Sequence, residues 1–188
     1  MNSTNTSSYT VPDMIHRVKV VVVGDGEVGK TSLIVRFTKG IFSLSYLMTI
    51  GVNFFVKDVN TEDKTVRLVI WDTGGQEQFG YIRQHYFVGS KGALICYDKS
   101  DTESFKRLDY WRNQIIQYCG NIPIIVVGCK ADLPAAISYD VGRQYAFQHR
   151  AGFAETSSKT GQNVSQTFSL LARLVLQYYS QRLSTPSE

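Results

Sequence analysis

A phosphate-binding motif at residues 24–31 constrains this chain more than any other feature of its sequence. The octapeptide GDGEVGKT fits the pattern G-x-x-x-x-G-K-[ST] of the P-loop. It directly follows residues 18–23, an apolar and β-branched run of strand length, and it precedes residues 32–37, which are typical of a helix start. The motif requires this strand–loop–helix context. The alternative is a glycine turn that binds no ligand.

The residue types of the loop suit the chemistry of a polyphosphate. Gly24 and Gly29 let the backbone curl so that its N–H groups point at the β-phosphate, and the helix N-terminus adds partial positive charge. Lys30 is expected to reach the β- and γ-oxygens and to stabilise charge in catalysis, and the Thr31 hydroxyl to ligate Mg²⁺. The other predicted contacts of the loop are Gly26, Glu27, Val28 and Ser32.

Size and composition indicate one globular domain. The chain has 188 residues, an apolar fraction of 43% and a mild net charge of +4, with no basic stripe that would favour nucleic acid. No apolar run is long enough to span a bilayer, and the polar N-terminus is not a signal peptide. Two of the three cysteines, Cys96 and Cys129, lie in apolar runs, which predicts buried thiols in a reducing compartment.

The order of apolar runs predicts the fold class. Short runs that are apolar on both faces are typical of buried parallel strands, and they fall at 18–23, 66–71, 93–97 and 124–129. Residues 52–60 and 65–71 resemble a hairpin. Helical patterns cover 30–38, 78–88, 102–118, 138–149 and 164–181. We therefore expect a three-layer α/β domain with a mostly parallel sheet and one antiparallel edge strand.

A second motif, WDTGGQE at residues 71–77, closes one of these strands. Asp72 is placed to hold Mg²⁺ as the acidic partner of the P-loop threonine. Gly75 can bring a backbone N–H against a γ-phosphate, and Gln76 is the predicted catalytic residue that orients the attacking water. An Asp at a strand end is often a helix cap, which is the alternative interpretation.

Five blocks occur in the order found in the Ras superfamily, and the chain resembles its Rab family. They are the P-loop, TIGVNF at 49–54, the second motif, GCKAD at 128–132 and ETSSK at 155–159. The resemblance covers about residues 14–180. It implies a P-loop NTPase G domain with a six-stranded sheet. We place this domain at 14–181, with disordered tails at 1–13 and 182–188.

The resemblance implies further roles. Thr49 resembles the switch threonine that binds Mg²⁺ by its hydroxyl and the γ-phosphate by its N–H. Phe42 corresponds to an aromatic that packs against guanine, although an apolar loop residue can also pack on its own domain. Phe54, Trp71 and Tyr86 correspond to the aromatics through which Rab proteins contact effectors. Ordinary core packing is the alternative for these three.

The base-recognition block departs from the family pattern. The family uses Asn-Lys-x-Asp, and this chain has Cys129 in place of the asparagine, followed by Lys130 and Asp132. Asp132 can accept hydrogen bonds from guanine N1–H and N2–H₂, and the stem of Lys130 can cover the base. A thiol is only a weak donor, so the contact with guanine N7 and the support of the P-loop are weakened. The predicted contacts in the last block are Ser157, Ser158 and Lys159.

Three other departures bear on affinity and membrane attachment. Glu27 places a carboxylate in the phosphate loop, where it repels polyphosphate unless it points to solvent or pairs with a cation. Gly74 stands where the family usually has alanine and loosens the second switch. The chain ends at Glu188 without the C-terminal cysteines to which Rab proteins attach prenyl groups. This sequence therefore does not support membrane anchoring through a prenyl group. Two explanations are open: the chain is shortened, or the native protein is not prenylated.

The resemblance implies a GTP/GDP-binding switch that hydrolyses GTP slowly with Mg²⁺ and works in vesicle trafficking. We expect weakened nucleotide affinity or fast exchange, a cytoplasmic monomer, and effectors, an exchange factor and a GTPase-activating protein as partners. Peripheral membrane attachment would require a missing tail or a partner. The alternatives are a degenerate GTPase that acts as an interaction module, and a P-loop ATP-using kinase, with which Asp132 conflicts.

Overall fold

The computed structural model describes residues 16–43, 49, 51–62, 64–74 and 85–184. The strands and helices, in chain order, are β1 His16–Val23, α1 Lys30–Lys39, β2 Val52–Asn60, β3 Thr65–Thr73, β4 Gly92–Asp98, α3 Thr102–Lys106, α4 Leu108–Cys119, β5 Ile124–Cys129, α5 Tyr139–Gln148, β6 Gly152–Glu155 and α6 Val164–Ser184. A further short helical segment covers residues 85–87.

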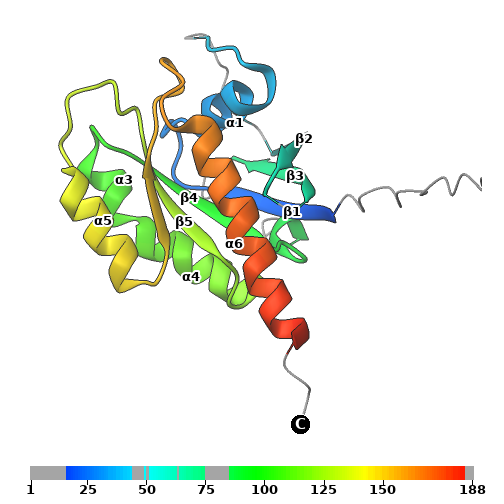
Figure 1. The fold of residues 1–188 in the computed structure, drawn as a ribbon. Coiled ribbons are helices and arrows are strands. Elements are labelled where there is room, and N and C mark those ends of the chain that lie inside the picture. The colour runs from blue at the N-terminus through cyan, green and yellow to red at the C-terminus, as the bar shows by residue number, and fades with distance from the viewer. Residues whose placement is uncertain (1–15, 44–48, 50, 63, 75–84, 185–188) are drawn as a thin grey trace, which may run out of the picture.

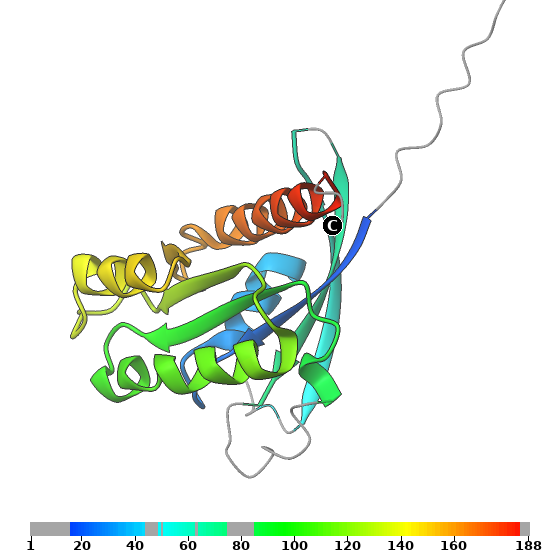
Figure 2. The ribbon, with the colours of Figure 1, turned by 90° about the horizontal axis from the view of Figure 1, so that it is seen from below.

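The strands form one six-stranded sheet in the order β2-β3-β1-β4-β5-β6. β1 pairs in parallel with β3 and β4, and β5 pairs in parallel with β4 and β6. Only the edge strand β2 runs antiparallel, in a hairpin with β3. Figure 1 and Figure 2 show the sheet between its helices. This arrangement confirms the predicted fold class.

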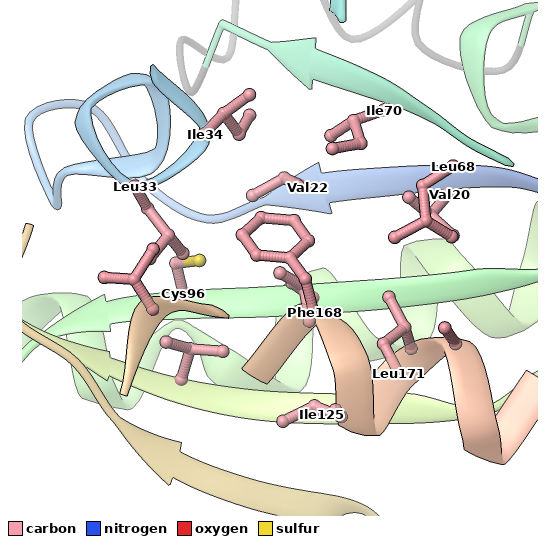
Figure 3. Packing of buried hydrophobic residues seen from close by; sticks show 14 of the residues in the cluster. Val20, Val22, Leu33, Ile34, Leu68, Ile70, Cys96, Ile125, Phe168 and Leu171 are labelled. Atoms are coloured by element: carbon pink, nitrogen blue, oxygen red, sulfur yellow. The ribbon is translucent and has the colours of Figure 1, made fainter. Parts of the chain in front are cut away.

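Alternation along β1 explains why the sheet is covered on both faces. Val20 and Val22 point into a cluster with α1 and α6, where Phe168 packs against the sheet (Figure 3). Val21 and Val23 point into the opposite cluster, which includes residues of α4 and α5. The four side chains from 20 to 23 therefore point to alternate faces and are all buried. This explains why the sequence of the strand is continuously apolar and does not alternate between apolar and polar residues.

The predicted helix over 102–118 was wrong as one element, because it divides into α3 and α4. Asp101 caps α3 by accepting hydrogen bonds from the backbone N–H groups of Glu103 and Ser104. Arg107 then takes φ −82° and ψ −3°, outside the regular helix, and separates the two helices. The last helix extends to Ser184, three residues beyond its predicted end. Residues 78–84 of the predicted helix 78–88 lie outside the described residues.

The family resemblance predicted six strands, but the sequence pattern did not locate β6, which has only four residues. Its place is fixed by parallel pairing with β5, in which Val127 lies beside Ala154. The parallel strands β1, β3, β4, β5 and β6 all end at the same edge of the sheet, where their following loops meet. Within the described residues, no helix combines the length and apolar character needed to cross a bilayer.

Candidate nucleotide-binding site

The loop between β1 and α1 has the backbone shape that the motif predicts. Gly24 has φ 143° and Gly29 has φ 105°, both in the region that favours glycine. A Cβ on Gly24 would collide with the backbone carbonyl of Cys96 on β4, so glycine is required for this close approach. The loop is therefore held against the end of the sheet, with the first turn of α1 behind it.

Lys30 is buried inside this loop, with only 6% of its surface exposed. Its Nζ donates hydrogen bonds to the backbone oxygens of Gly24, at 2.8 Å, and Asp25. Burial lowers the pKa of Lys30, and nearby groups that include the Asp72 carboxylate oppose that shift. The ammonium is thus directed along the inner wall of the loop.

Three oxygen-bearing side chains from separate segments meet beside Lys30. The hydroxyls of Thr31 and Thr49 are 2.7 Å apart, and the Thr31 hydroxyl donates to Asp72 Oδ2 at 2.7 Å. Burial raises the pKa of Asp72, against the hydrogen bond from Thr31. Its Oδ1 is buried and has no hydrogen-bond partner among the residues that the structure describes. This set of hard oxygen donors, with one unsatisfied acceptor, fits Mg²⁺ held in part through water.

The blocks at 128–132 and 155–159 lie side by side, although β5 and β6 are separated in the chain by α5. The N–H of Thr156 donates to Gly128 O, and the N–H of Ala131 donates to Thr156 O. Ser157 Oγ donates to Asp132 Oδ1 at 2.6 Å. Asp132 is otherwise exposed to solvent.

Lys130 is oriented by a carboxylate on the neighbouring strand. Its Nζ lies 2.7 Å from Asp98 Oδ2, at the end of β4. The backbone of Lys130 has a positive φ of 58°, which is uncommon for a residue other than glycine. Lys130 and Asp132 therefore lie on the same loop after β5, and each is held by one side chain from a neighbouring segment.

Cys129 is buried in the hydrophobic cluster that underlies the phosphate loop. It is buried in the same cluster as Cys96, and both thiols are free. The contact with Cys129, together with burial, raises the pKa of the Cys96 thiol. A Cβ on Gly29 would lie 3.8 Å from the Cys129 Cβ, so the phosphate loop rests against this residue. The prediction of buried thiols is confirmed for both residues.

Three aromatic side chains form a row across β2, β3 and the segment before β4. The ring centroids of Phe54 and Trp71 are 6.2 Å apart, and those of Trp71 and Tyr86 are 6.1 Å apart. Phe54 is 70% exposed, while the other two are half-buried. Core packing therefore does not describe Phe54, and the row presents apolar surface to solvent.

Other predicted residues take varied positions. Val28 is buried, Ser32, Phe42 and Ser158 are half-buried, and the side chains of Glu27 and Lys159 are exposed. Space is open around the Cα of Gly26, where an added Cβ would meet no atom within 4 Å. Gly75 and Gln76 lie outside the described residues, so their assigned roles stay predictions.

Asp25 connects the phosphate loop to α4, a role that the sequence motif did not predict. Its Oδ1 accepts a hydrogen bond from the Trp111 indole at 2.7 Å, and Arg107 Nε lies 3.4 Å away. Asp25 occupies a variable position of the motif, and its partner is 86 residues away in sequence. The only available signal was a second carboxylate in a loop that binds phosphate.

Comparison with known proteins places the chain in a family. The sequence pattern of the Ras family matches residues 19–177. Ras-related protein RIC1 of Oryza sativa subsp. japonica is 38% identical over 86% of this chain and 81% of that protein. GTP-binding protein YPT1 of Saccharomyces cerevisiae is 38% identical over 87% and 81%. Ras-related protein RABD2a of Arabidopsis thaliana is 39% identical over 84% and 79%.

The matched region contains the phosphate loop, the three oxygen donors and the paired base-recognition loops. The chain belongs to the Ras family and is a Rab-like small GTPase, an enzyme that hydrolyses GTP.

Proposed function

We propose that this GTPase is a GTP/GDP switch in vesicle trafficking that binds guanine nucleotides more weakly, and releases them faster, than its relatives. One observation carries the proposal of weaker binding. The side chain at the first base-recognition position is the buried thiol of Cys129, which contacts Cys96 under the phosphate loop and carries no amide. The proposed G domain covers residues 14–181, and the proposed state is a cytoplasmic monomer.

The residues of the phosphate end would hold the triphosphate and its metal ion. Backbone N–H groups from Gly24 to Lys30 would face the phosphates, and Lys30 would exchange its contacts with loop carbonyls for phosphate oxygens. Thr31, Thr49 and Asp72 would hold Mg²⁺. When bound, this ion neutralises charge on the β- and γ-phosphates. Thr49 would link this metal site to the first switch.

The base end would select guanine through fewer contacts. Asp132 would accept two hydrogen bonds from the base while Ser157 holds its other oxygen, and Lys130 would lie along the base. With Cys129 in place of an amide, one hydrogen bond to guanine is missing. An unpaired polar group in a dry site costs about 1–3 kcal/mol, or roughly tenfold to a hundredfold in affinity.

The catalytic assignment rests on Gln76 and Lys30. Gln76 would orient the attacking water, and the Lys30 ammonium would stabilise the charge that develops on the transferred phosphoryl group. The exposed row of Phe54, Trp71 and Tyr86 would be the surface that effectors contact. An exchange factor and a GTPase-activating protein would act as regulators, as is general for Rab-type GTPases.

The test is nucleotide content followed by release of a fluorescent GDP. We expect guanine nucleotide, at less than full occupancy, in the purified protein. Cys129→Asn should slow GDP release several-fold, by on the order of 1–2 kcal/mol, and Cys119→Ser is the control because that half-buried thiol lies outside the site. If only Cys129→Asn with Glu27→Gly slows release, repulsion from Glu27 dominates. Unchanged release in both variants contradicts the weakened affinity.

The same preparation separates an active enzyme from a degenerate one. Single-turnover phosphate release should be slow but measurable in the wild type and at least tenfold lower in Gln76→Leu, with GDP affinity nearly unchanged. An empty site in the purified protein would favour an interaction module, and bound adenine nucleotide would favour an ATP-using enzyme.

A further inference from the structure

The phosphate loop is fastened to α4 through the side chain of Asp25. The backbone carbonyl of Asp25 accepts a hydrogen bond from Lys30, so this residue helps to place the ammonium inside the loop. Its carboxylate turns the other way and accepts hydrogen bonds from Trp111 Nε1 at 2.7 Å and from Arg107 Nε at 3.4 Å. One residue therefore joins the loop's catalytic cation to a helix that supplies no predicted nucleotide contact.

The helix is a rigid support for this contact. The Trp111 ring is fully buried, in the cluster that contains Val21 and Val23 of β1 and Ile115 of α4. Its indole N–H points out of that cluster to the half-buried carboxylate. A hydrogen bond between a buried donor and an ionised acceptor is short and roughly twice as strong as a neutral one.

The contact also removes a negative charge from the path of the phosphates. Asp25 and Glu27 are both carboxylates of the phosphate loop, but they differ in surroundings. Glu27 is exposed to solvent, where screening weakens its field, whereas Asp25 is neutralised by Arg107 and directed to α4. Without its partners, the Asp25 carboxylate would be free to turn toward bound phosphate and repel it.

We propose that Trp111 is a positioning residue for the phosphate loop, which acts through Asp25 to slow nucleotide release. The usual support for this loop, an amide at position 129, is absent here, so more of the loop's order depends on α4. The inference rests on the proposed function only in requiring that guanine nucleotide binds at the loop.

The test compares Trp111→Phe in two backgrounds. Phenylalanine keeps an aromatic ring in the cluster and removes the indole donor. We expect it to speed release of a fluorescent GDP about tenfold in the wild-type background. In Asp25→Ala, where the acceptor is already gone, the same change should alter release by less than about twofold. Equal acceleration in both backgrounds would show that lost packing is responsible, and no acceleration in the wild type would also overturn the proposal.

Ile115→Val is the matched control, because it trims a buried side chain on the same helix without touching Asp25. It should lower the unfolding midpoint while leaving GDP release unchanged. A second measurement needs no nucleotide. Amide hydrogen exchange at residues 24–31 of the nucleotide-free protein should be faster in Trp111→Phe than in Ile115→Val.

The outcomes keep the two proposals apart. A wild type that binds no guanine nucleotide contradicts the proposed function, while faster loop exchange in Trp111→Phe would still support the positioning role. A wild type that binds nucleotide, with release and loop exchange unchanged in Trp111→Phe, contradicts the positioning role alone.

Discussion

The site has a phosphate end, formed by residues 24–31 with Thr49 and Asp72, and a base end, formed by residues 128–132 and 155–159. The two ends differ in burial and in the interactions that hold their side chains. At the phosphate end, Lys30 and Asp72 are buried, and the Thr31 hydroxyl lies 2.7 Å from both the Thr49 hydroxyl and the Asp72 carboxylate. At the base end, Asp132 is exposed and is held by one hydroxyl, and Lys130 is held by one carboxylate. The phosphate end relies on backbone shape and buried charge, whereas the base end relies on a few side chains near solvent.

This difference explains which end can tolerate substitution. A change among buried, mutually dependent groups leaves a partner unsatisfied in a site with little solvent, so its cost is large. A change at the base end removes one contact and leaves its neighbours in place, so its cost is graded. Cys129 is a substitution at the base end, whereas Lys30, Thr31 and Asp72 keep the residue types that bind phosphate and metal.

The largest expected effect is that of Lys30→Ala, which attacks the phosphate end directly. Removing the buried ammonium should weaken binding of a non-hydrolysable GTP analogue about a hundredfold or more, on the order of 3 kcal/mol. Isothermal titration would measure it. Lys39→Ala is the control, because that lysine is exposed at the other end of α1. Unchanged affinity in Lys30→Ala would contradict the assignment of the P-loop.

An intermediate effect is expected from Gly74→Ala, which restores the usual family residue. A Cβ at position 74 would lie 2.8 Å from the Thr49 carbonyl and 3.3 Å from that of Gly51. The backbone must therefore shift, and we expect a shift at Thr49 that separates its hydroxyl from Thr31. We expect about fivefold weaker binding of a GTP analogue, roughly 1 kcal/mol, with GDP binding nearly unchanged.

Titration of both nucleotides would test the Gly74 prediction. Gly152→Ala serves as the control, because an added Cβ there would crowd the Ile125 side chain on β5 at 3.1 Å, away from the switch. Equal weakening of GDP and GTP analogue would mean that Gly74 acts on the whole site, and not through Thr49.

The smallest effect is expected from Asp98→Asn, which removes the partner of Lys130 at the base end. Burial raises the pKa of Asp98, but hydrogen bonds from Lys130 and Ser100 outweigh it and hold that pKa below its usual value. The ionised carboxylate therefore stabilises the fold above the unfolded pKa of about 4, and this contribution is lost as pH falls through the native pKa.

We therefore expect Asp98→Asn to lower the free energy of unfolding by about 0.5 kcal/mol at pH 7, a value reduced by solvent screening. Denaturant unfolding at pH 7 and near pH 3 should show the difference from the wild type closing in acid. Asp140→Asn is the control, because its pair with Arg143 is long, at 3.9 Å, and exposed. A difference that stays constant with pH would mean that the charge of Asp98 is not the cause.

Local pattern predicted the strands and the phosphate loop because both depend on short stretches of chain. The buried strand β1 and the positive φ angles of Gly24 and Gly29 follow from residue types within the motif. The interruption at Arg107 was not predictable, because residues 102–118 keep a helical pattern on both sides of it. The short strand β6 was not located, because only its pairing with β5 identifies it.

The sequence by itself determined the family, the fold class and the residue types at the phosphate and metal positions, because these lie in contiguous motifs with fixed local geometry. The tertiary structure decided which side chains work together. It buried Cys129 beside Cys96, and it joined Asp25 to Trp111 across 86 residues. Such contacts form only after the sheet and the helices bring distant segments together, so the distance between two residues along the chain does not predict them.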